Sequence, residues 1–578
     1  MDFELFIMLI SEILKTELKK ITKTEDFSVQ LSQRLEFGDY TTNLAFILAK
    51  SRGQSPFLVA EDIKKDLLSK RSLEKYFDRI EIKNGYLNFF LSKSALVEQL
   101  SKDAKSVLKP KKQKKVIVEY SSPNIAKPFT IGHLRSTIIG DAIANLFEIS
   151  GWKVLRDNHL GDWGTQFGKM IYAIKAWGDE VKISKSSRPI KELVDLYVKF
   201  HAEAEKKTRI EEDARAWFKK LEDGDKEARR IWKKCVNWSF KEFDQIYKVL
   251  GISFSKEFQR GRGLGESFFE DKMSVVLQEL RKKRFLKKGE EGAELFFFKN
   301  EKFPPAMILK KDGATLYHTR DLATDKYRKT EYKPDLVINE VGSEQALYFS
   351  QLFEMEKLLG WYKDEQRVHV GHGLINFKDG KMSTRKGNVI WMEEVVNEAI
   401  SRAREVIKGK SSSLPVKNLE EVATVVGVGA IKYNDLSQNR STDIAFDWEK
   451  MLSFKGNSSP YIQYGFSRLN NILKKANFKG QKLSEGDLEV FSPAELSILR
   501  KITQLPEAIN EARNQFLPNL IANYVFELSS EVHAFYENYP VLMAEAKQKQ
   551  SRLKLIFSAV KTIKICLGLL GIETPERI

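Results

Sequence analysis

The spacing of apolar and polar residues predicts a small mixed domain at the start of the chain. Apolar side chains recur at helical spacing around Leu9 and Leu14, and a later run, 86–91, is extended and largely apolar. This combination predicts an α+β domain over residues 1–107. The basic stretch 109–115 interrupts both patterns and predicts a linker or domain boundary, with a solvated hinge as the simplest role for its lysines.

The middle of the chain alternates between strand and helix patterns. Three short apolar segments, 116–118, 336–338 and 368–370, have the composition of buried parallel strands. The first is followed by a polar loop and then by apolar residues at four-residue intervals from Leu134 to Leu146, which predicts a helix. Repeated strand–loop–helix units predict an α/β fold with a Rossmann-type, doubly wound parallel sheet, whose ligands bind beyond the carboxyl ends of the strands.

Two other parts of the chain have helical patterns without sustained strand alternation. Segment 178–260, dense in Lys, Glu and Trp, predicts a helical insertion within a sheet domain that spans 108–400. Residues 401–440 predict a connecting helical segment, and residues 441–578 predict a C-terminal all-α helical bundle. The expected architecture is an N-terminal α+β domain, a Rossmann-type domain with a helical insertion, and a C-terminal helical domain.

Composition agrees with a globular protein of about three to four domains. The 578 residues are 42% hydrophobic and 30% charged, too apolar for a disordered chain and too charged for a membrane protein. Asp2 and Glu4 stand where a signal peptide has its basic region, and no apolar run reaches the roughly 18 residues that a membrane span needs. We therefore expect a cytoplasmic protein. Cys235 and Cys566 lack the spacing of a disulfide framework or a metal site.

The chain carries a net charge of +17, from 96 Lys and Arg against 79 Asp and Glu. Such an excess favours a polyanionic partner, because basic side chains release counterions when they bind phosphates. A basic protein without any specific partner is the alternative that charge alone leaves open.

The loop 119–133, between the first strand of the sheet and the following helix, contains the first candidate chemistry. It places Gly132 and His133 at a helix N-terminus, where free N–H groups and the helix dipole favour phosphate. His133 can donate to a phosphate oxygen, and Gly132 permits a base or ribose to approach the backbone. A histidine that only caps the helix is the alternative.

A second loop, 381–388, follows the third strand and carries three cations, Lys381, Arg385 and Lys386. A basic loop in this position can close over a triphosphate and neutralise charge that develops in the transition state. A solvated surface loop is the alternative for such a run of charges.

Together, the two loops resemble the signature pair of class I aminoacyl-tRNA synthetases, which read His-Ile-Gly-His and Lys-Met-Ser-Lys-Ser in the ideal case. The resemblance is closest to the arginyl-tRNA synthetase family and extends, in the family's order, over nearly the whole chain. Thr130 stands where the ideal motif has its first histidine, and Thr384-Arg385 replace the second Lys-Ser. The matching stretches include SSPNIAKPFTIGHLRSTIIGDA, NHLGDWGTQFG, DGATLYHTRDLA, VGSEQALYF, DGKMSTRKGNV and KYNDLSQNRSTDIAFDWEKMLSF.

The resemblance implies an enzyme that activates L-arginine with ATP and transfers the arginine to the terminal ribose of tRNA(Arg). We expect Mg²⁺ to enter only with ATP, no structural metal, no membrane association, and a monomer. A cysteinyl or glutaminyl enzyme of the same class is one alternative, and the pocket acids Glu119 and Asp321 speak against it. An inactive RNA-binding relative is the other, and the presence of His133 and Lys381 speaks against that.

Site residues follow from the reaction and from the matching motif positions. Because no covalent enzyme intermediate is required, catalysis should depend on positioning and charge stabilisation. A planar, always charged guanidinium requires carboxylates at fixed geometry. We predict catalytic contacts from His133, Lys381, Ser383, Arg385, Lys386 and Lys127, ATP contacts from Thr130, Gly132, His133, Lys381 and Met382, and, by resemblance, arginine contacts from Glu119, Asn124, Tyr317, Asp321 and Gln345.

Several polar residues have open alternatives. A salt bridge to Arg320 or Lys326 is the alternative for Asp321, and His369 and His372 lack further ligands at zinc spacing. Four residues resemble the family's site edge, with packing as their alternative: Asp157, His159, Asp162 and Gln166.

Aromatic side chains in the C-terminal domain lie beside basic residues such as Arg513 and Lys547. Such side chains suit stacking on unpaired anticodon bases. A core position is the alternative for each of them. The predicted tRNA contacts are His533, Phe535, Tyr536 and Tyr539.

Overall fold

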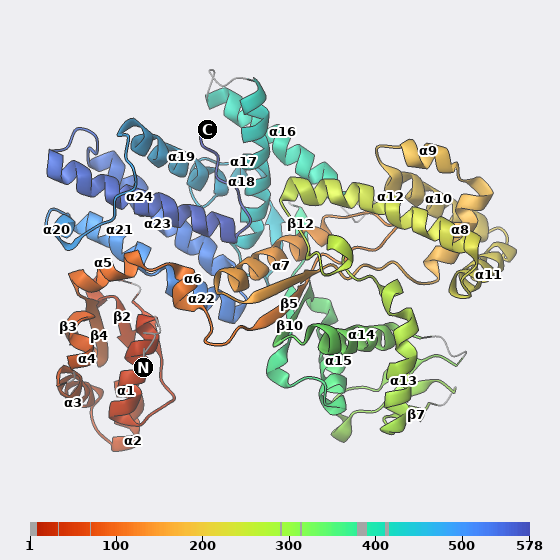
Figure 1. Cartoon of the computed structure of the whole chain (residues 1–578), viewed down its shortest axis with the longest axis horizontal. Helices are drawn as coiled ribbons and strands as arrows, with labels where there is room; N and C mark the ends of the chain where they lie inside the picture. Colours follow the sequence, from red (N-terminus) through yellow and green to blue (C-terminus); the bar gives the residue numbers. More distant parts are fainter. Residues whose placement is uncertain are drawn as a thin grey trace.

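The computed structural model describes residues 9–32, 34–69, 71–289, 292–311, 315–377, 390–410 and 416–578. Figure 1 shows the N-terminal module and the C-terminal helices at one end, the parallel sheet in the centre, and a helical insertion at the other end. Among the described helices, none combines the length and the apolar composition that a bilayer crossing requires.

The N-terminal module is α+β, as predicted, and consists of an antiparallel sheet covered by helices. The strand order is β1-β2-β4-β3, and β4 coincides with the predicted apolar run. Its elements are α1 (Ile10–Thr22), β1 (Val29–Leu31), β2 (Tyr40–Thr42), α2 (Leu44–Arg52), α3 (Pro56–Leu68), α4 (Arg71–Glu74), β3 (Phe77–Lys83) and β4 (Tyr86–Leu91). Two helices, α5 (Lys93–Ser101) and α6 (Ala104–Leu108), follow it and pack on the C-terminal helices.

The central sheet has four parallel strands in the order β11-β10-β5-β6, namely β11 (Arg367–His372), β10 (Leu336–Gly342), β5 (Lys115–Glu119) and β6 (Lys153–Asp157). After β5 the chain first forms β6 on one side of it and later forms β10 on its other side. The connections thus lead away from β5 on opposite sides, which makes the gap between β5 and β10 the switch point of the sheet. All three strands predicted from the sequence are present. The carboxyl ends of β5 and β10 therefore mark the expected ligand edge.

Helices cover both faces of this sheet, which confirms the doubly wound prediction. On β5, Val116 and Val118 belong to the core that includes α7 (Gly132–Ile149), whereas Ile117 faces the core that includes α15 (Ala346–Leu359). The helix α7 lies unusually close to the end of β5, because a Cβ at Gly140 would collide with the side chain of Tyr120. This close approach fixes the N-terminus of α7 beside the ligand edge.

The predicted helical insertion consists of α9 (Glu180–Lys185), α10 (Pro189–Ala204), α11 (Arg209–Glu222) and α12 (Lys226–Leu250), which follow α8 (Gln166–Trp177). After it, the structure contains an antiparallel sheet that the sequence pattern did not predict. Its strands are too short to show alternation, since β7 (Leu286–Lys288), β8 (Glu294–Phe296) and β9 (Ala306–Leu309) have three or four residues each. The helices around this sheet are α13 (Met273–Lys282) and α14 (Tyr317–Tyr327).

The C-terminal part is helical, as predicted, with one exception near its start. The strand β13 (Ile444–Phe446) pairs in parallel with β12 (Ile375–Phe377), and this pairing was again too short to predict. Two long helices, α16 (Met392–Lys410) and α17 (Val416–Leu436), connect the sheet to the bundle. The bundle contains α18 (Trp448–Met451), α19 (Ser459–Lys475), α20 (Glu485–Leu488), α21 (Pro493–Thr503), α22 (Leu505–Gln515), α23 (Asn519–Asn538) and α24 (Ala546–Leu569).

A buried ion pair joins the sheet domain to α17. The Nε of Arg135 on α7 lies 3.0 Å from the Oδ2 of Asp435, and the two side chains are 1% and 3% exposed. Arg135 also donates to the carbonyl oxygens of Thr442 and Arg440, at 2.8 and 3.2 Å. The guanidinium is thus fully occupied, and removal of its one carboxylate would leave a buried charge without compensation.

We expect Asp435→Ala to lower the free energy of unfolding by about 3–5 kcal/mol, because breaking a buried pair leaves the other charge desolvated. The midpoint of urea unfolding measures this loss. The matched control is Asp223→Ala, which removes the exposed partner of Lys219 and should leave the midpoint where it is in the unmodified chain. Equal midpoints for both variants would show that this junction does not stabilise the fold.

Candidate active site

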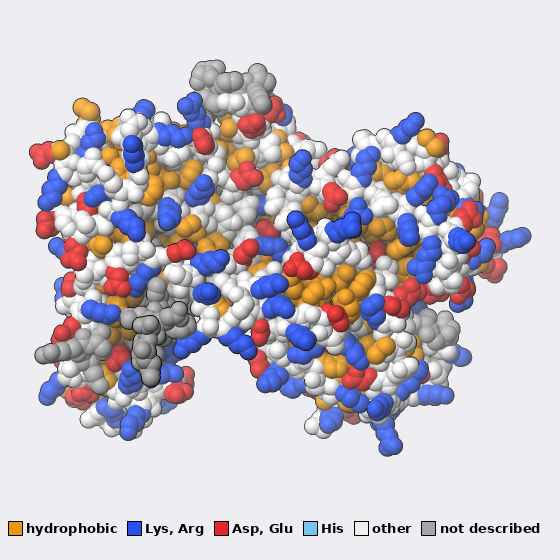
Figure 2. Space-filling model, in the orientation of Figure 1, with side chains coloured by type: hydrophobic (Ala, Val, Ile, Leu, Met, Phe, Trp, Pro, Cys, Tyr) orange, Lys and Arg blue, Asp and Glu red, His pale blue; other side chains and the backbone are white. Residues whose placement is uncertain are grey.

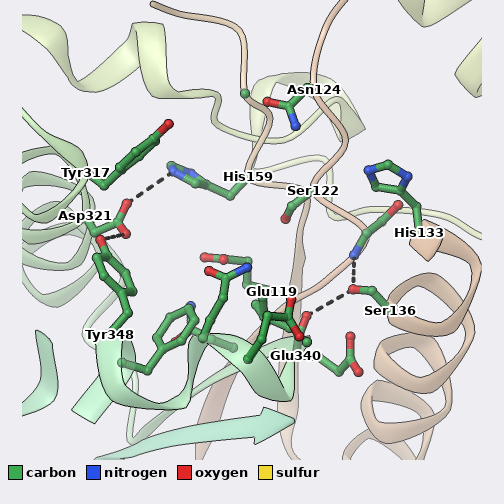
Figure 3. Close-up of a pocket in the computed structure, with 18 of the residues that line it drawn as sticks. Glu119, Ser122, Asn124, His133, Ser136, His159, Tyr317, Asp321, Glu340 and Tyr348 are labelled. Atoms are coloured by element: carbon green, nitrogen blue, oxygen red, sulfur yellow. Dashed lines mark hydrogen bonds and ion pairs between the residues drawn. The ribbon is translucent and has the colours of Figure 1, made fainter. Parts of the chain in front are cut away.

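A cavity of about 670 Å³ opens at the carboxyl ends of β5 and β10, at the predicted ligand edge. Figure 3 shows that its labelled side chains come from two sides, with Tyr317, Asp321 and Tyr348 facing His133 and Ser136 across Glu119 and Ser122. Nine predicted site residues line it together: Glu119, Asn124, Lys127, Thr130, Gly132, His133, Tyr317, Asp321 and Gln345. The other five predicted catalytic or ATP contacts, Lys381, Met382, Ser383, Arg385 and Lys386, lie outside the described residues.

The first signature loop forms one wall of the cavity. His133 is in the first turn of α7, and its Nδ1 accepts from the backbone N–H of Thr130 at 3.2 Å and lies 3.0 Å from the Thr130 hydroxyl. Because Nδ1 acts as an acceptor, Nε2 carries the proton in the neutral ring. Burial lowers the pKa of His133 and outweighs the contact with Thr130. His133 is therefore a neutral N–H donor at a helix N-terminus, a position that suits an anion.

The segment that follows the second signature loop in the sequence, Ile390–Met392, is hydrogen-bonded to this wall. Ile131 N–H donates to the carbonyl of Ile390 at 3.1 Å, and Met392 N–H donates to the carbonyl of Phe129 at 2.9 Å. Thr130 and Trp391 form the intervening antiparallel bridge. The segment that leaves the second loop thus runs directly beside the first, although the two are far apart in the sequence.

Acidic and aromatic side chains form the opposite wall. Asp321 on α14 accepts a hydrogen bond from the hydroxyl of Tyr348, and its other oxygen lies 3.8 Å from Nε2 of His159. Glu266, also in the lining, pairs with Arg320 at 3.2 Å. Burial raises the pKa of Asp321 to about 6, against the opposing effect of His159, and the pKa of Glu266 to about 7, against Arg320. Two acids that lack full compensation prepare this wall for a cation.

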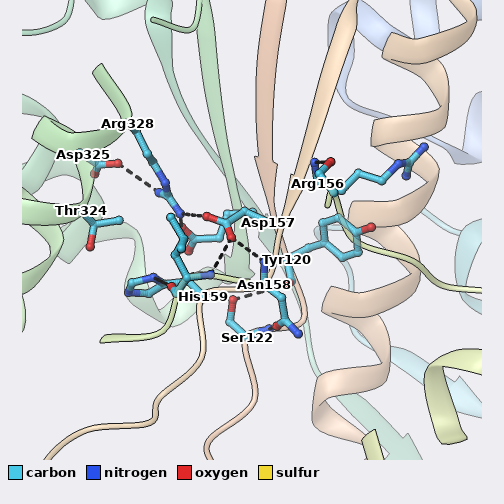
Figure 4. Close-up of polar contacts among 12 residues, drawn as sticks. Tyr120, Ser122, Arg156, Asp157, Asn158, His159, Thr324, Asp325 and Arg328 are labelled. Carbon is cyan, nitrogen blue, oxygen red and sulfur yellow. Dashed lines mark hydrogen bonds and ion pairs between the residues drawn. The ribbon is translucent and has the colours of Figure 1, made fainter. Parts of the chain in front are cut away.

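Glu119 is held by an internal guanidinium. Arg328, which is 1% exposed, donates from Nη2 to Glu119 and, at 2.6 Å, to Asp157, and from Nη1 to Asp325 at 3.1 Å (Figure 4). Burial alone would raise the pKa of Glu119, but Arg328 and His159 lower it below its usual value. Glu119 is therefore an ionised acid of the cavity floor, with one oxygen already committed to the protein itself.

These contacts decide several alternatives. Arg320 pairs with Glu266 and Lys326 with Glu279, so neither forms the salt bridge considered for Asp321. The four predicted site-edge residues do not all reach the cavity. His159 lines the cavity, whereas Asp157 is bound by Arg328, Asp162 accepts from the backbone and hydroxyl of Ser267, and Gln166 donates to the carbonyl of Trp163.

Sequence reasoning missed Glu266 and Tyr348 as cavity residues. Glu266 stands in the short 3₁₀ segment Glu266–Lys272, outside every recognised motif spacing, and only the fold brings it to the cavity. Tyr348 lies within the quoted stretch VGSEQALYF, three residues after Gln345, so one helical turn on α15 was the available signal.

The predicted tRNA contacts in the C-terminal bundle need a correction. Phe535 is 2% exposed and His533 is 8% exposed, because α23 packs them against neighbouring helices. His533 lies against the rings of Tyr461 and Tyr536, at centroid distances of 4.5 and 5.4 Å. Neither His533 nor Phe535 can stack on a base in this conformation. Tyr536 and Tyr539 are only half-buried and stay predicted contacts.

The sequence matches three protein families in chain order. These are "Arginyl tRNA synthetase N terminal domain" over residues 8–91, "tRNA synthetases class I (R), catalytic domain" over 95–448, and "DALR anticodon binding domain" over 462–578. The arginine–tRNA ligase of Halothermothrix orenii is 39% identical over 578 residues, which cover 98% of each chain. That of Clostridioides difficile is 39% identical and covers 99% of this chain and all of its own.

The chain belongs to the arginyl-tRNA synthetase family. Family members join arginine to tRNA with the use of ATP, so a cysteinyl or glutaminyl specificity is excluded. The crystal structure of the Plasmodium falciparum arginyl-tRNA synthetase superimposes with a TM-score of 0.84 at 27% identity, over 99% of this chain and 100% of that one. The Thermus thermophilus arginyl-tRNA synthetase shares the fold, with a TM-score of 0.83 at 24% identity.

Proposed function

We propose that the two walls of the cavity divide the substrates of an arginyl-tRNA synthetase between them. The acidic wall, Asp321, Glu266 and Tyr348, takes the arginine side chain, and the α7 wall takes ATP. The observation that supports this division is the pair of half-buried acids with raised pKa values opposite a neutral donor at a helix N-terminus. A bound cation stabilises the ionised acids of the first wall, and the helix N-terminus of the second wall stabilises a bound anion.

The chemistry then needs only positioning. A carboxylate oxygen of arginine attacks the α-phosphorus of ATP, and the bond to pyrophosphate breaks. A ribose hydroxyl at the end of tRNA next attacks the carbonyl carbon of the arginyl-adenylate, and AMP leaves. His133 donates to a phosphate oxygen from the end of α7, and Lys127 at the cavity rim adds charge. Mg²⁺ enters as part of the MgATP substrate.

Lys381, Ser383, Arg385 and Lys386 belong to the same proposal. The attachment of Ile390–Met392 to Phe129–Ile131 supports it, because that pairing brings the end of the second loop to the α7 wall. Three cations delivered beside the triphosphate would neutralise charge on the departing pyrophosphate. Met382 would contact the nucleotide from the same loop.

Arginine-dependent exchange of pyrophosphate into ATP, with and without tRNA(Arg), tests the function. We expect exchange with arginine and tRNA, and none with lysine or citrulline, because only the guanidinium offers a charged planar fork to two acids. Absence of exchange under all conditions, with tRNA binding retained, would favour the inactive RNA-binding relative instead.

We further propose that the protein is a cytoplasmic monomer with domains at 1–107, 108–400, 401–440 and 441–578, the insertion spanning about 178–260. The bundle would contact the anticodon through Tyr536 and Tyr539. On the face shown in Figure 2, Lys and Arg side chains are spread over the whole surface among Asp and Glu, with no single basic patch. A large, dispersed contact with tRNA fits this distribution.

The affinity for tRNA(Arg) should fall steeply with salt. If the chain neutralises about 6–10 phosphates, the association constant drops by about 10³–10⁵ between 50 and 200 mM salt. Filter binding across this range measures the slope, with the KM for arginine as the control that should change far less. A flat response would mean that the excess of +17 has no part in tRNA binding.

A further inference from the structure

Two charged side chains of the cavity have no role in the division proposed above. Glu340 is on β10 and His372 is the last residue of β11, and both line the cavity. In the parallel register, His372 lies opposite Gly342, at the carboxyl edge of the sheet. Ligands of doubly wound sheets bind at this edge. Neither residue belongs to the signature loops.

The two side chains form a buried pair. Nδ1 of His372 lies 2.7 Å from Oε1 of Glu340, and Glu340 is 1% exposed. The other oxygen of Glu340, Oε2, is enclosed without a hydrogen-bond partner among the described residues. A buried carboxylate with so few donors needs a positive charge beside it. The imidazole of His372 is the group that forms an ion pair with this carboxylate, and the guanidinium of Arg440 also lies within electrostatic reach of it.

The pair is also joined to the α7 wall. The hydroxyl of Ser136, three residues after His133, donates to the backbone carbonyl of Glu340 at 3.0 Å (Figure 3). The position of Glu340, and with it that of His372, is thus fixed relative to the helix N-terminus that faces the phosphate site. Nε2 of His372 has no partner in the described part of the chain, so it remains the polar atom that this ring can offer to a ligand.

Charges around the ring favour its protonated form. Burial alone would lower the pKa of His372, but the carboxylate of Glu340 outweighs it and raises the pKa above its usual value. Asp435 acts in the same direction and Arg135 against it. The charged or titratable groups that face this ring are Glu340 on β10, Asp435 on α17, Arg135 on α7, His369 on the same strand, and Arg440 beyond α17, which donates to the carbonyl of Gly371.

The motif Thr130–His133 at the start of α7, by contrast, provides no such charge. Thr130 replaces the first histidine of the ideal motif, and its N–H and hydroxyl are both directed at Nδ1 of His133. His133 itself is neutral, because burial lowers its pKa. At the base of the cavity, the described residues of that motif therefore present neutral donors, whereas the imidazole of His372, with its raised pKa, lies on β11.

We propose that His372, held and charged by Glu340, donates a hydrogen bond from Nε2 to a phosphate oxygen of ATP and so replaces the imidazole missing at position 130. His372 is then a catalytic residue, and Glu340 is the residue that positions it. The inference rests on the proposed placement of ATP at the α7 wall. It also gives a role to the carboxylate of Glu340, which has few donors and lies in the same cavity as the proposed site of ATP, an anion.

Pyrophosphate exchange with saturating arginine and tRNA provides the first test. His372→Phe should lower kcat/KM for ATP on the order of 100-fold, the usual effect of losing one donor aimed at developing charge. Glu340→Gln should lower it by roughly 10-fold, since the ring remains but loses its orientation and charge. The KM for arginine should stay unchanged in both. His369→Gln is the matched control on the same strand, because His369 does not line the cavity, and it should behave as the unmodified chain.

Rescue and pH dependence separate a phosphate contact from a structural role. Thr130→His in the His372→Phe background should restore at least 10-fold of the lost ATP use, which a packing defect would not allow. In the unmodified chain, kcat/KM for ATP should fall as pH rises through the pKa of His372, and this fall should be absent in His372→Gln.

Two results would overturn the inference: unchanged ATP kinetics in His372→Phe, or a loss that Thr130→His does not repair. If His372→Phe loses arginine binding as well, isothermal titration of ATP into His372→Gln and Glu340→Gln decides in its place, with wild-type affinity counting against the proposal. Failure of the unmodified chain to exchange pyrophosphate would instead refute the proposed function.

Discussion

Replacement of Asp321 by asparagine should lower kcat/KM for arginine by a factor between about 30 and several thousand, with little change in the KM for ATP. The magnitude corresponds to the roughly 2–5 kcal/mol lost when one member of a buried charge-assisted pair is removed. Asp321 is half-buried, is oriented by Tyr348, and has no lysine or arginine partner among the described residues, so the substrate guanidinium would be its main counterion. Steady-state kinetics of pyrophosphate exchange measure both constants.

Low pH should weaken arginine use in the unmodified chain, in part as the Asp321→Asn substitution does. The pKa of Asp321 is raised to about 6 and that of Glu266 to about 7. In the proposed arrangement, arginine binds the ionised forms of both acids. The KM for arginine should therefore rise as pH falls from above 7 through 6, and this rise should be smaller in Asp321→Asn. Asp364→Asn, at an exposed carboxylate paired with Lys357, is the control and should leave the pH profile unaltered. An unchanged KM for arginine in Asp321→Asn would remove this residue from the pocket.

Replacement of His133 by alanine should slow adenylate formation about 10²-fold or more, as expected for a preorganised donor at developing charge. The same change at Thr130 should have only a modest effect, because the Thr130 hydroxyl is directed at the His133 ring rather than free for ATP. Thr130→His should be as active as the unmodified chain or more active, since a longer donor that can carry charge would then reach the phosphates. Single-turnover formation of arginyl-adenylate, at saturating ATP and tRNA, measures these rates.

His201→Ala, on α10 of the insertion, is the matched control for loss of a histidine and should form adenylate at the normal rate. Equal damage from Thr130→Ala and His133→Ala would give threonine a specific catalytic role. It would also contradict a division of phosphate stabilisation among His133, the N-terminus of α7 and the second loop.

The fold was accessible from the sequence wherever an element was long or strongly patterned. The runs at 116–118, 336–338 and 368–370 became β5, β10 and β11, because a strand buried on both faces must be apolar throughout. Helix α7 followed from four-residue spacing. The strands β7, β8 and β9 could not be predicted, since three or four residues are too few to show the two-residue alternation of a strand.

The site was accessible only where a residue lay in one of the two signature loops or in another stretch that resembles the family, as Tyr317 and Asp321 do. Glu266 comes from a short 3₁₀ segment, and the contact between Glu340 and His372 depends on the register of β10 with β11, which no single-sequence pattern fixes. The prediction that His533 and Phe535 of α23 contact tRNA was wrong for a related reason. Its sequence is apolar on more than one side, so the pattern could not tell that Phe535 faces inward while Tyr536 is partly open to solvent.

The pairing of Phe129–Ile131 with Ile390–Met392 has a consequence for the order of synthesis. A ribosome that has just completed α7 must add about 240 further residues before the partner of that loop exists, which takes roughly 12–48 s at about 5–20 residues per second. Throughout that interval the nascent chain carries His133 without the backbone partners that hold its loop in place. A translation product interrupted anywhere in this stretch lacks the backbone partner of the α7 wall. The nucleotide chemistry proposed for that wall therefore requires synthesis of most of the chain.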